Sequence, residues 1–511
     1  MDNSIFRPLV EVFAVERHGE AVNANSFDEV ADSAWFTNTL GAHDMTLAEL
    51  KAGACKPAEL LDGESAAEGA WLIDKGKANG ASLGFRVNIK GKGKYLFKTD
   101  PKGQPERATA ASVIGAAAYN AVGFYTSCEQ VVYFKPSVLK LMSGLRYENN
   151  SGVVRDFDKK ALQSVLDEAT KRGELVRMQA SAWLPGQLIG PFRYEGTRSD
   201  DPNDVIPHDD RRELRGGRLL AAWIDHFDAR EQNSMDSWIA DAGKKGPADS
   251  SPGYVRHYYL DTSDSLGSEW DWDGVSRRMS HSYLLDWGDI GLDFIGFGIP
   301  IRPWERVERA KGHEKFGYFD IATFVPEDWK NEYPNPAFSR MTERDGAWMA
   351  RILARFSPEM VRALAEDGRF SDPSDTAYIA TVLSARLERI LGRYLTRLSP
   401  LTDVRVEGGN QLCALDLARY RHLHSSEQFR YSAQLVAGAS LPVSPRLDDT
   451  VCVALPQRSL PTALPDSAPA RYRVVSISNG VSPGALLVHL YELGAARGFR
   501  VVGLERLETA Q

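Results

Sequence analysis

The order in which the spacing of apolar residues changes along the chain constrains the fold most strongly. Apolar and polar residues alternate in 84–89 and 94–98 around a Gly/Lys turn, which predicts a β-hairpin. A spacing of about 3.6 residues over 341–356, 358–367 and 375–398 predicts a block of helices. Short alternating runs return in 472–480, 484–494 and 498–507. Because strands and helices come in separate blocks, we predict an α+β fold.

Composition narrows the class of protein. The chain has 511 residues, of which 43% are apolar and 25% charged, as expected for a soluble globular protein with several folding units. The formal net charge of −8 argues against a main role in binding nucleic acid phosphates or an anionic membrane, so we expect no nucleic acid partner. No stretch approaches the roughly 20 apolar residues that cross a bilayer, so we expect no membrane span.

The amino terminus lacks a basic start followed by an apolar run, which makes the cytoplasm the default location and leaves an exported mature chain open. The four cysteines Cys55, Cys128, Cys413 and Cys452 are far apart and form no CxxC or Cys/His cluster. We therefore expect neither a zinc site nor a disulfide scaffold, while pairing of two cysteines in an oxidising compartment stays open.

Local patterns place further elements before any function is considered. Residues 106–122 are rich in small helix formers and stop at Gly123, which predicts a helix. The run 129–134 alternates like a strand, and 174–184 is typical of a strand that ends before Pro185. Residues 211–225 predict a helix, and 234–241 with 254–261 predict two strands joined by a turn-rich segment.

One motif has the spacing of a catalytic loop. His226-Phe-Asp228-Ala-Arg-Glu-Gln-Asn233 has the H-x-D-x-x-x-x-N spacing of a phosphoryl-transfer catalytic loop, and it lies between a predicted helix and a predicted hairpin. The hairpin ends at Asp261-Thr-Ser-Asp264-Ser-Leu-Gly267. This order resembles the protein-kinase-like superfamily, and the D-x-x-x-x-L-G form looks closer to phosphatidylinositol kinases and HipA-type kinases than to the usual D-F-G. Asp286-Trp-Gly288 is nearer in letters, but it lies too far beyond the hairpin.

The resemblance implies a role for each residue at a matching position. Lys98, on the second strand of the hairpin, would contact the α- and β-phosphates of ATP. Asp228 would accept the proton of the substrate hydroxyl. Asn233 and Asp261 would hold Mg²⁺ through their oxygens, with Asp264 as a further ligand. The implied cofactors are therefore ATP and Mg²⁺, and the implied partner is a hydroxyl-bearing substrate whose identity the letters do not give.

The same resemblance implies the surroundings of the nucleotide. The loop from Gly80 to Gly84 would fold over the phosphates, although it is only a partial Gly-rich motif. Glu106, the one acidic residue at the head of the next helix, would pair with Lys98. The backbone around Met178 and Ala180 would bind adenine at a hinge between lobes.

We therefore expect a bilobal protein-kinase-like fold with two flanking regions. Residues 1–75 form an N-terminal extension, 76–182 a β-rich lobe, 183–400 a helical lobe and 401–511 a small antiparallel β domain resembling a sandwich. The expected function is an ATP- and Mg²⁺-dependent phosphotransferase acting on a hydroxyl of a protein, lipid or small molecule. Two alternatives keep the fold: a pseudokinase scaffold, and an enzyme that transfers AMP. A fourth hypothesis is a module that binds a protein or carbohydrate partner through the C-terminal β region.

Each nominated residue also has a structural interpretation. Lys98 could be a solvated strand lysine like its neighbours Lys92 and Lys94. Asp228 and Asn233 could cap a turn, and Asp261 could cap the segment that follows it. The aromatic residues Trp270, Trp272, Tyr283 and Trp287 are more typical of a core or an interface than of a ligand site.

Overall fold

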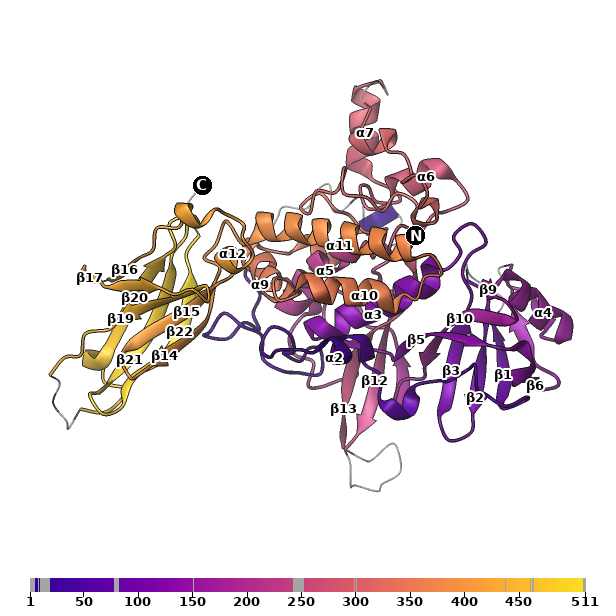
Figure 1. The fold of residues 1–511 in the computed structure, drawn as a ribbon, viewed down its shortest axis with the longest axis horizontal. Helices are drawn as coiled ribbons and strands as arrows, with labels where there is room; N and C mark the ends of the chain where they lie inside the picture. The colour runs from indigo at the N-terminus through magenta and orange to yellow at the C-terminus, as the bar shows by residue number, and fades with distance from the viewer. Residues whose placement is uncertain are drawn as a thin grey trace.

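The computed structural model has an elongated shape with a β unit at each end and helices between them (Figure 1). The structure describes residues 5–7, 9, 19–77, 82–149, 151–241, 252–297, 299, 301–436, 438–459, 461 and 464–508. The mixture of helices and sheets confirms the α+β class. Within the described residues, no helix is long and apolar enough to cross a membrane.

The N-terminal sheet contains the predicted hairpin. Its strands run in the order β5-β10-β3-β2-β1-β6, with β9 paired to β10. They span β1 Trp71–Lys77, β2 Gly84–Ile89, β3 Gly93–Lys98, β5 Glu129–Phe134, β6 Leu139–Leu141, β9 Lys171–Arg172 and β10 Leu175–Ala182. A separate two-stranded hairpin follows β6, formed by β7 Arg146–Glu148 and β8 Val154–Asp156. One face of the sheet is apolar and packs Phe85, Phe97 and Phe134 against helix α4 Lys159–Glu168.

Helix α3 Arg107–Val122 lies against the other face and ends at Gly123, as its composition predicted. It touches β5 and β10, and 15 of its 16 residues are buried, which explains why it carries small side chains on every face. Most of its apolar residues belong to the core of the central helices, together with Trp35, Phe36 and Leu50 of the N-terminal region. The first 75 residues therefore contribute to this core.

The central helices are α5 Arg212–Ile224, α9 Glu343–Leu353, α10 Pro358–Asp367 and α11 Pro373–Tyr394. The shorter helices around them are α2 Leu47–Ala52, α6 Asp273–Arg278, α7 Trp287–Ile295 and α8 Pro336–Ser339. A second sheet, of order β11-β12-β13-β4, combines two strands that precede α5 with two strands that follow it. Its strands are β4 Tyr125–Thr126, β11 Gln187–Gly190, β12 Ser234–Ala240 and β13 Gly253–Tyr259. The motif from His226 to Asn233 therefore connects α5 to β12, and Asp261 follows β13.

The C-terminal region consists of two antiparallel sheets around an apolar core (Figure 1). The strand orders are β14-β15-β19-β18 and β17-β16-β20-β21-β22. The first sheet contains β14 Leu401–Glu407, β15 Gln411–Asp416, β18 Val443–Pro445 and β19 Thr450–Ala454. The second contains β16 Ser432–Leu435, β17 Ser440–Leu441, β20 Tyr472–Ser478, β21 Leu486–Gly494 and β22 Gly498–Arg506. Helix α12 Leu417–Tyr420 packs Leu417 into the central core.

The cysteines correct the sequence interpretation. Cys55 bonds to Cys128, 73 residues further on, and Cys413 bonds to Cys452 across the directly opposed positions of β15 and β19. No cysteine is left free. The spacing along the chain did not reveal these pairs because each is made by strands or loops that meet only in the folded protein.

Candidate functional site

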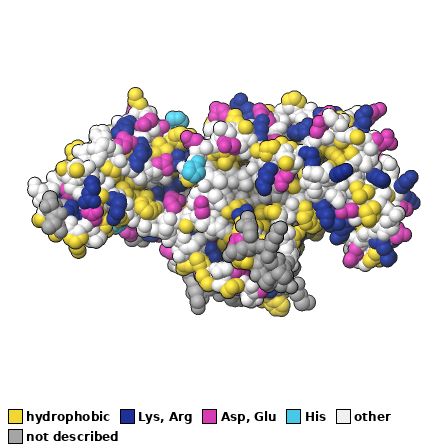
Figure 2. Space-filling view, turned by 90° about the horizontal axis from the view of Figure 1, so that it is seen from below, with side chains coloured by type: hydrophobic (Ala, Val, Ile, Leu, Met, Phe, Trp, Pro, Cys, Tyr) yellow, Lys and Arg dark blue, Asp and Glu magenta, His cyan; other side chains and the backbone are white. Residues whose placement is uncertain are grey.

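The candidate site begins on the polar face of the N-terminal sheet. Side chains alternate along a strand, so Lys98 shares the face of Leu96 while Tyr95 and Phe97 enter the apolar core. On β10, the residue opposite Lys98 is Gln179. Helix α3 contacts β5 and β10, and Lys98 ends β3 beside them. Lysine and arginine side chains gather on this end of the molecule (Figure 2).

The first functional contact joins this sheet to the loop after β13. Lys98 Nζ lies 2.7 Å from Asp261 Oδ2, although the two residues are 163 positions apart, and the Lys98 side chain is only 8% exposed. Burial alone would lower the pKa of Lys98, but the charge of Asp261 outweighs it and raises that pKa. The same contact, with a hydrogen bond from Ser263, overcomes the effect of burial on Asp261 and holds its pKa well below the usual range. Both groups are therefore charged at neutral pH.

The second contact lies within the motif itself. Asn233 Nδ2 donates to Asp228 Oδ2 and to the Asp228 carbonyl, both at 2.8 Å. Arg230 Nε lies 2.7 Å from Asp228 Oδ1, and Arg230 Nη1 donates to Glu332 Oε2 at 3.0 Å. Burial and the neighbouring carboxyls of Glu332 and Asp264 raise the pKa of Asp228 despite Arg230. The site thus contains a carboxyl group that is poised to hold a proton.

Asp264 connects the two contacts electrostatically. Its negative charge acts on Lys98 and also on Asp228, so these three side chains share one region. Asp264 Oδ1 accepts a hydrogen bond from Ser268 Oγ at 3.1 Å. His226 lies beneath the site, where Tyr119 OH meets its Nδ1 at 3.0 Å and burial lowers its pKa to about 4. A neutral, buried His226 supports the loop and is no proton carrier at neutral pH.

Helix α3 holds the loop that carries Asp261 and Asp264. Arg107 Nη1 donates to the carbonyls of Ser263 and Ser265, at 2.6 and 2.9 Å. About two helical turns further on, the helix passes so close to the loop that a Cβ added at Gly115 would lie 2.4 Å from Thr262 Oγ1. Asp261 itself has φ of 52°, a left-handed conformation that is uncommon for a residue other than glycine. Packing therefore determines the position of the Asp261 carboxylate.

The prediction that Glu106 pairs with Lys98 is wrong. Glu106 accepts a hydrogen bond from Lys315 Nζ at 3.1 Å and two from the Ser371 backbone and hydroxyl. It precedes α3 with φ of 66°, and its side chain ties the helix to residues of the central unit. The structure therefore gives Glu106 a structural role and pairs Lys98 with Asp261.

The expected adenine contacts at Met178 and Ala180 are also wrong. Both residues lie in the middle of β10, between β3 and β5, and both are fully buried in the apolar core. Ala180 pairs on both edges, with Phe97 of β3 and Gln130 of β5, whereas Met178 pairs with Val132 of β5 and lies one residue before the β3 pairing begins. The chain leaves the sheet only after Ala182, so a connection to the next sheet begins at Trp183.

The two glycines of the expected phosphate loop differ in outcome. Gly80 lies outside the described residues. Gly84 is the first residue of β2 and pairs with both Lys77 and Lys98. A Cβ at Gly84 would lie 2.0 Å from the Phe97 carbonyl, so the close approach of β2 to β3 requires glycine there. Its role in the structure is therefore strand packing beside Lys98.

Two charged residues at the site were missed by sequence reasoning. Lys77 Nζ donates to the Ser82 carbonyl at 2.8 Å, and burial together with the charge of Lys98 lowers its pKa to about 8. Glu129 acts electrostatically on Lys98, and it accepts hydrogen bonds from Ser127, Ser181 and Gln179. Burial raises the pKa of Glu129. Its strand was predicted, but its nearness to Lys98 depends on β10 lying between β5 and β3.

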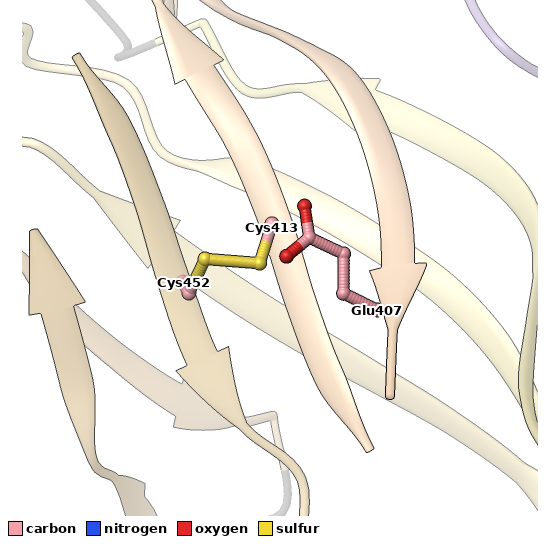
Figure 3. A group of neighbouring side chains, drawn as sticks. All are labelled: Glu407, Cys413 and Cys452. Atoms are coloured by element: carbon pink, nitrogen blue, oxygen red, sulfur yellow. A yellow bond between two sulfur atoms is a disulfide. The ribbon is translucent and has the colours of Figure 1, made fainter. Parts of the chain in front are cut away.

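Two other groups of residues are not metal-binding sites in the structure. Asp286, of the alternative D-W-G motif, caps α7 through the Asp289 N–H and pairs with Lys330 at 2.6 Å. Glu407, Cys413 and Cys452 lie close enough together to suggest a metal site, but both sulfurs belong to one disulfide (Figure 3). Disulfide sulfurs are not thiolates, which are the form that binds metals. This cluster is therefore not a metal centre.

No family model, curated protein or solved structure matches the chain. The geometry of the site and the motif resemblance are therefore the basis for a proposed function.

Proposed function

We propose that the protein is an ATP- and Mg²⁺-dependent phosphotransferase with a two-lobed, kinase-like arrangement, in which residues 76–182 form the β-rich lobe and 183–400 the helical lobe. The observation that carries the proposal is the 2.7 Å contact between Lys98 Nζ and Asp261 Oδ2. It joins the lysine at the end of β3 to the aspartate after β13, beside the Asp228–Asn233 pair. These are the residue types that phosphoryl transfer requires, in kinase order.

The side chains fit a nucleotide with a divalent cation. Lys98 and Lys77 supply positive charge for the phosphates, and the oxygens of Asp261, Asp264 and Asn233 are the hard ligands that Mg²⁺ prefers. Asn233 is held through its nitrogen, and among the described residues its Oδ1 accepts no hydrogen bond. The Asp261 side chain is 36% exposed and so is accessible from solvent. Bound Mg²⁺ would neutralise charge on the phosphate oxygens.

A cavity beside Lys77 is a suitable place for the rest of the nucleotide. Its lining includes Lys77, Arg86, Leu96 and Trp183, from three neighbouring strands and the connection after β10. The Arg86 guanidinium lies 5.2 Å from the centre of the Trp183 ring. We infer that the base binds here, near Trp183, instead of at Met178 and Ala180.

In the proposed reaction the acceptor hydroxyl oxygen forms a bond to the γ-phosphorus as the bond from that phosphorus to the β–γ bridging oxygen breaks. ADP leaves with the electron pair of the broken bond. In its deprotonated form Asp228 accepts the hydroxyl proton, and Asn233 and Arg230 hold its carboxylate in position. Lys98 stabilises the charge on the phosphates.

The test compares Mg²⁺·ATP binding by calorimetry with phosphate transfer from γ-labelled ATP. We expect Lys98→Met to weaken ATP binding by about tenfold or more, because a buried cation is lost. We expect Asp228→Asn to leave binding within about twofold and to lower turnover by about a hundredfold or more. Lys94→Met, at an exposed lysine on the same face of β3, is the matched control and should behave as the wild type.

Three results separate the alternatives. Absence of Mg²⁺·ATP binding by the wild-type protein contradicts the proposal. Binding without any turnover identifies a pseudokinase. A product whose added mass equals AMP identifies transfer of the nucleotide instead of the γ-phosphate.

A further inference from the structure

A second cavity, of about 210 Å³, lies between the catalytic motif and the segment that follows Asp261. Its walls contain Phe227 of the motif, the aromatic and aliphatic side chains of 270–284, and Glu332. The apolar residues that line it are Phe227, Trp270, Trp272, Val275, Met279 and Leu284. A concave site with mostly apolar walls and a few polar groups is typical of small-molecule binding.

One end of this cavity is lined by Phe227 and Glu332, which adjoin the proposed base, although Asp228 itself does not line it. Phe227 immediately precedes Asp228, and its carbonyl accepts a hydrogen bond from the Glu332 N–H at 2.7 Å. Arg230 contacts both the Asp228 and the Glu332 carboxyls, at 2.7 and 3.0 Å. A molecule in the cavity would therefore lie beside residues that adjoin and hold Asp228.

Another part of the wall carries a cation. Arg278 Nη2 donates to Ser282 Oγ at 3.2 Å and to the Tyr283 carbonyl at 3.5 Å. Across the described part of the chain, no carboxylate lies within ion-pair distance of Arg278, whereas Arg277 and Arg309 pair with Asp273. A half-buried guanidinium that its own protein leaves without a counter-charge favours an anionic ligand.

The aromatic wall is open to a ligand. Trp272 is 73% exposed and Trp270 is 42% exposed, although large apolar side chains usually bury most of their surface. Indole rings stack on flat apolar surfaces and can still meet a polar group at their edge. The cavity thus combines a stacking surface, a cation and a nearby carboxyl pair.

We propose that this cavity binds the phosphate acceptor, and that the acceptor is a small alcohol with a flat ring and a carboxylate or phosphate group. The inference rests on the proposed phosphotransferase only for the transfer of phosphate to the acceptor hydroxyl. Binding of the acceptor in the cavity does not depend on it. The ring stacks on Trp270 and Trp272, the anion meets Arg278, and the hydroxyl lies toward Asp228. This chemistry selects against large protein acceptors and long-chain neutral lipids.

The test measures binding without nucleotide, by calorimetry and by quenching of tryptophan fluorescence. The probes are 4-hydroxyphenylacetate, 4-(hydroxymethyl)phenyl phosphate and the neutral 4-hydroxyphenylacetamide. We expect the wild-type protein to bind at least one anion about tenfold more tightly than the amide. Which anion binds more tightly distinguishes a carboxylate from a phosphate ligand. Arg278→Gln should abolish the preference, and Trp272→Ala should weaken all three probes.

Arg306→Gln is the matched control, because Arg306 is exposed on a neighbouring segment and does not line the cavity. Equal binding of anions and amide by the wild type, or no binding of any probe, overturns the inference. ATP binding measured on the same samples keeps the two proposals apart. If ATP binds and the probes do not, only the acceptor site is wrong; if the anions bind and ATP does not, the phosphotransferase is wrong and the anion site stands.

Discussion

Lys98 shows how the environment of a single side chain decides its role. A strand lysine is usually solvated, but Lys98 is almost fully buried and meets Asp261 directly, with Glu129 and Asp264 nearby. Removing one member of such a pair leaves a charge without its partner in a poorly solvated place. The pair therefore couples the N-terminal sheet to the loop after β13 whatever reaction the protein performs.

A double-mutant cycle measures this coupling. We expect Lys98→Met and Asp261→Asn each to lower the free energy of unfolding, and the double variant to be less destabilised than the sum of the two, by about 1 to 3 kcal/mol. Chemical denaturation of all four proteins gives the coupling energy. The same cycle with Lys94→Met should give a coupling near zero, and additive effects at Lys98 and Asp261 would contradict the observed contact.

Helix α3 shows how one element positions the site. Its residue composition predicted the helix and its end at Gly123, and both are confirmed. The reason for a glycine in its middle was not readable from the sequence, because Thr262 lies far along the chain. Gly115 allows the helix to touch the loop that carries Asp261 and Asp264. Similarly, a Cβ added at Gly216 of α5 would lie 3.2 Å from the Asp345 carbonyl, whereas one at Gly217 would have more room.

Alanine at these glycines separates packing from helix propensity. Alanine is favoured over glycine inside a helix by about 1 kcal/mol. A substitution whose Cβ fits without a clash should therefore increase the stability of the protein. We expect Gly115→Ala to destabilise by about 1 to 3 kcal/mol, because its Cβ overlaps buried Thr262, and to weaken Mg²⁺·ATP binding.

Gly217→Ala is the matched control. Its nearest neighbour would be Phe124 at 3.5 Å, an ordinary contact, so we expect unchanged or slightly higher stability. Thermal unfolding of both variants checks the pair. A stabilised Gly115→Ala protein would show that α3 does not press against the loop.

A buried ionic cluster connects distant parts of the molecule. Asp28, in the N-terminal region, contacts Arg212 of α5, Arg351 of α9 and Arg506 of β22. The nearby Ser26 carbonyl accepts a hydrogen bond from the Leu504 N–H at 2.7 Å. The N-terminal region thus lies between the central helices and the C-terminal sandwich. The sandwich has its own core, but it is fixed to the rest of the protein through these contacts.

This cluster predicts how stability depends on pH. Burial alone would raise the pKa of Asp28, but the charges of Arg351, Arg506 and Arg212 outweigh it and lower the pKa to about 2. A lowered pKa in the folded state contributes stability above the unfolded pKa, near 4, and that contribution is lost as the pH falls toward 2. We expect Asp28→Asn to lose about 2 to 3 kcal/mol at pH 7 and progressively less below pH 4.

Denaturation at a series of pH values checks this prediction. Asp44→Asn, at an exposed aspartate of the same region, should follow the wild type at every pH. A constant difference between Asp28→Asn and the wild type from pH 7 to pH 2 would show that the Asp28 charge is not the cause.

The sequence by itself determined the secondary structure and those contacts of the site that join residues close together along the chain. Periodicity and end signals identified the hairpin of β2 and β3, the helices from α9 to α11 and the last strands, because these depend on neighbouring residues. Asp228 and Asn233 meet because they lie only five positions apart in one loop. Only the tertiary structure decided that Lys98 pairs with Asp261 and not Glu106, that β10 is buried between two strands, and that the cysteines pair. Those contacts join residues far apart in the chain, where the packing of sheets and helices, and not sequence spacing, sets the distance.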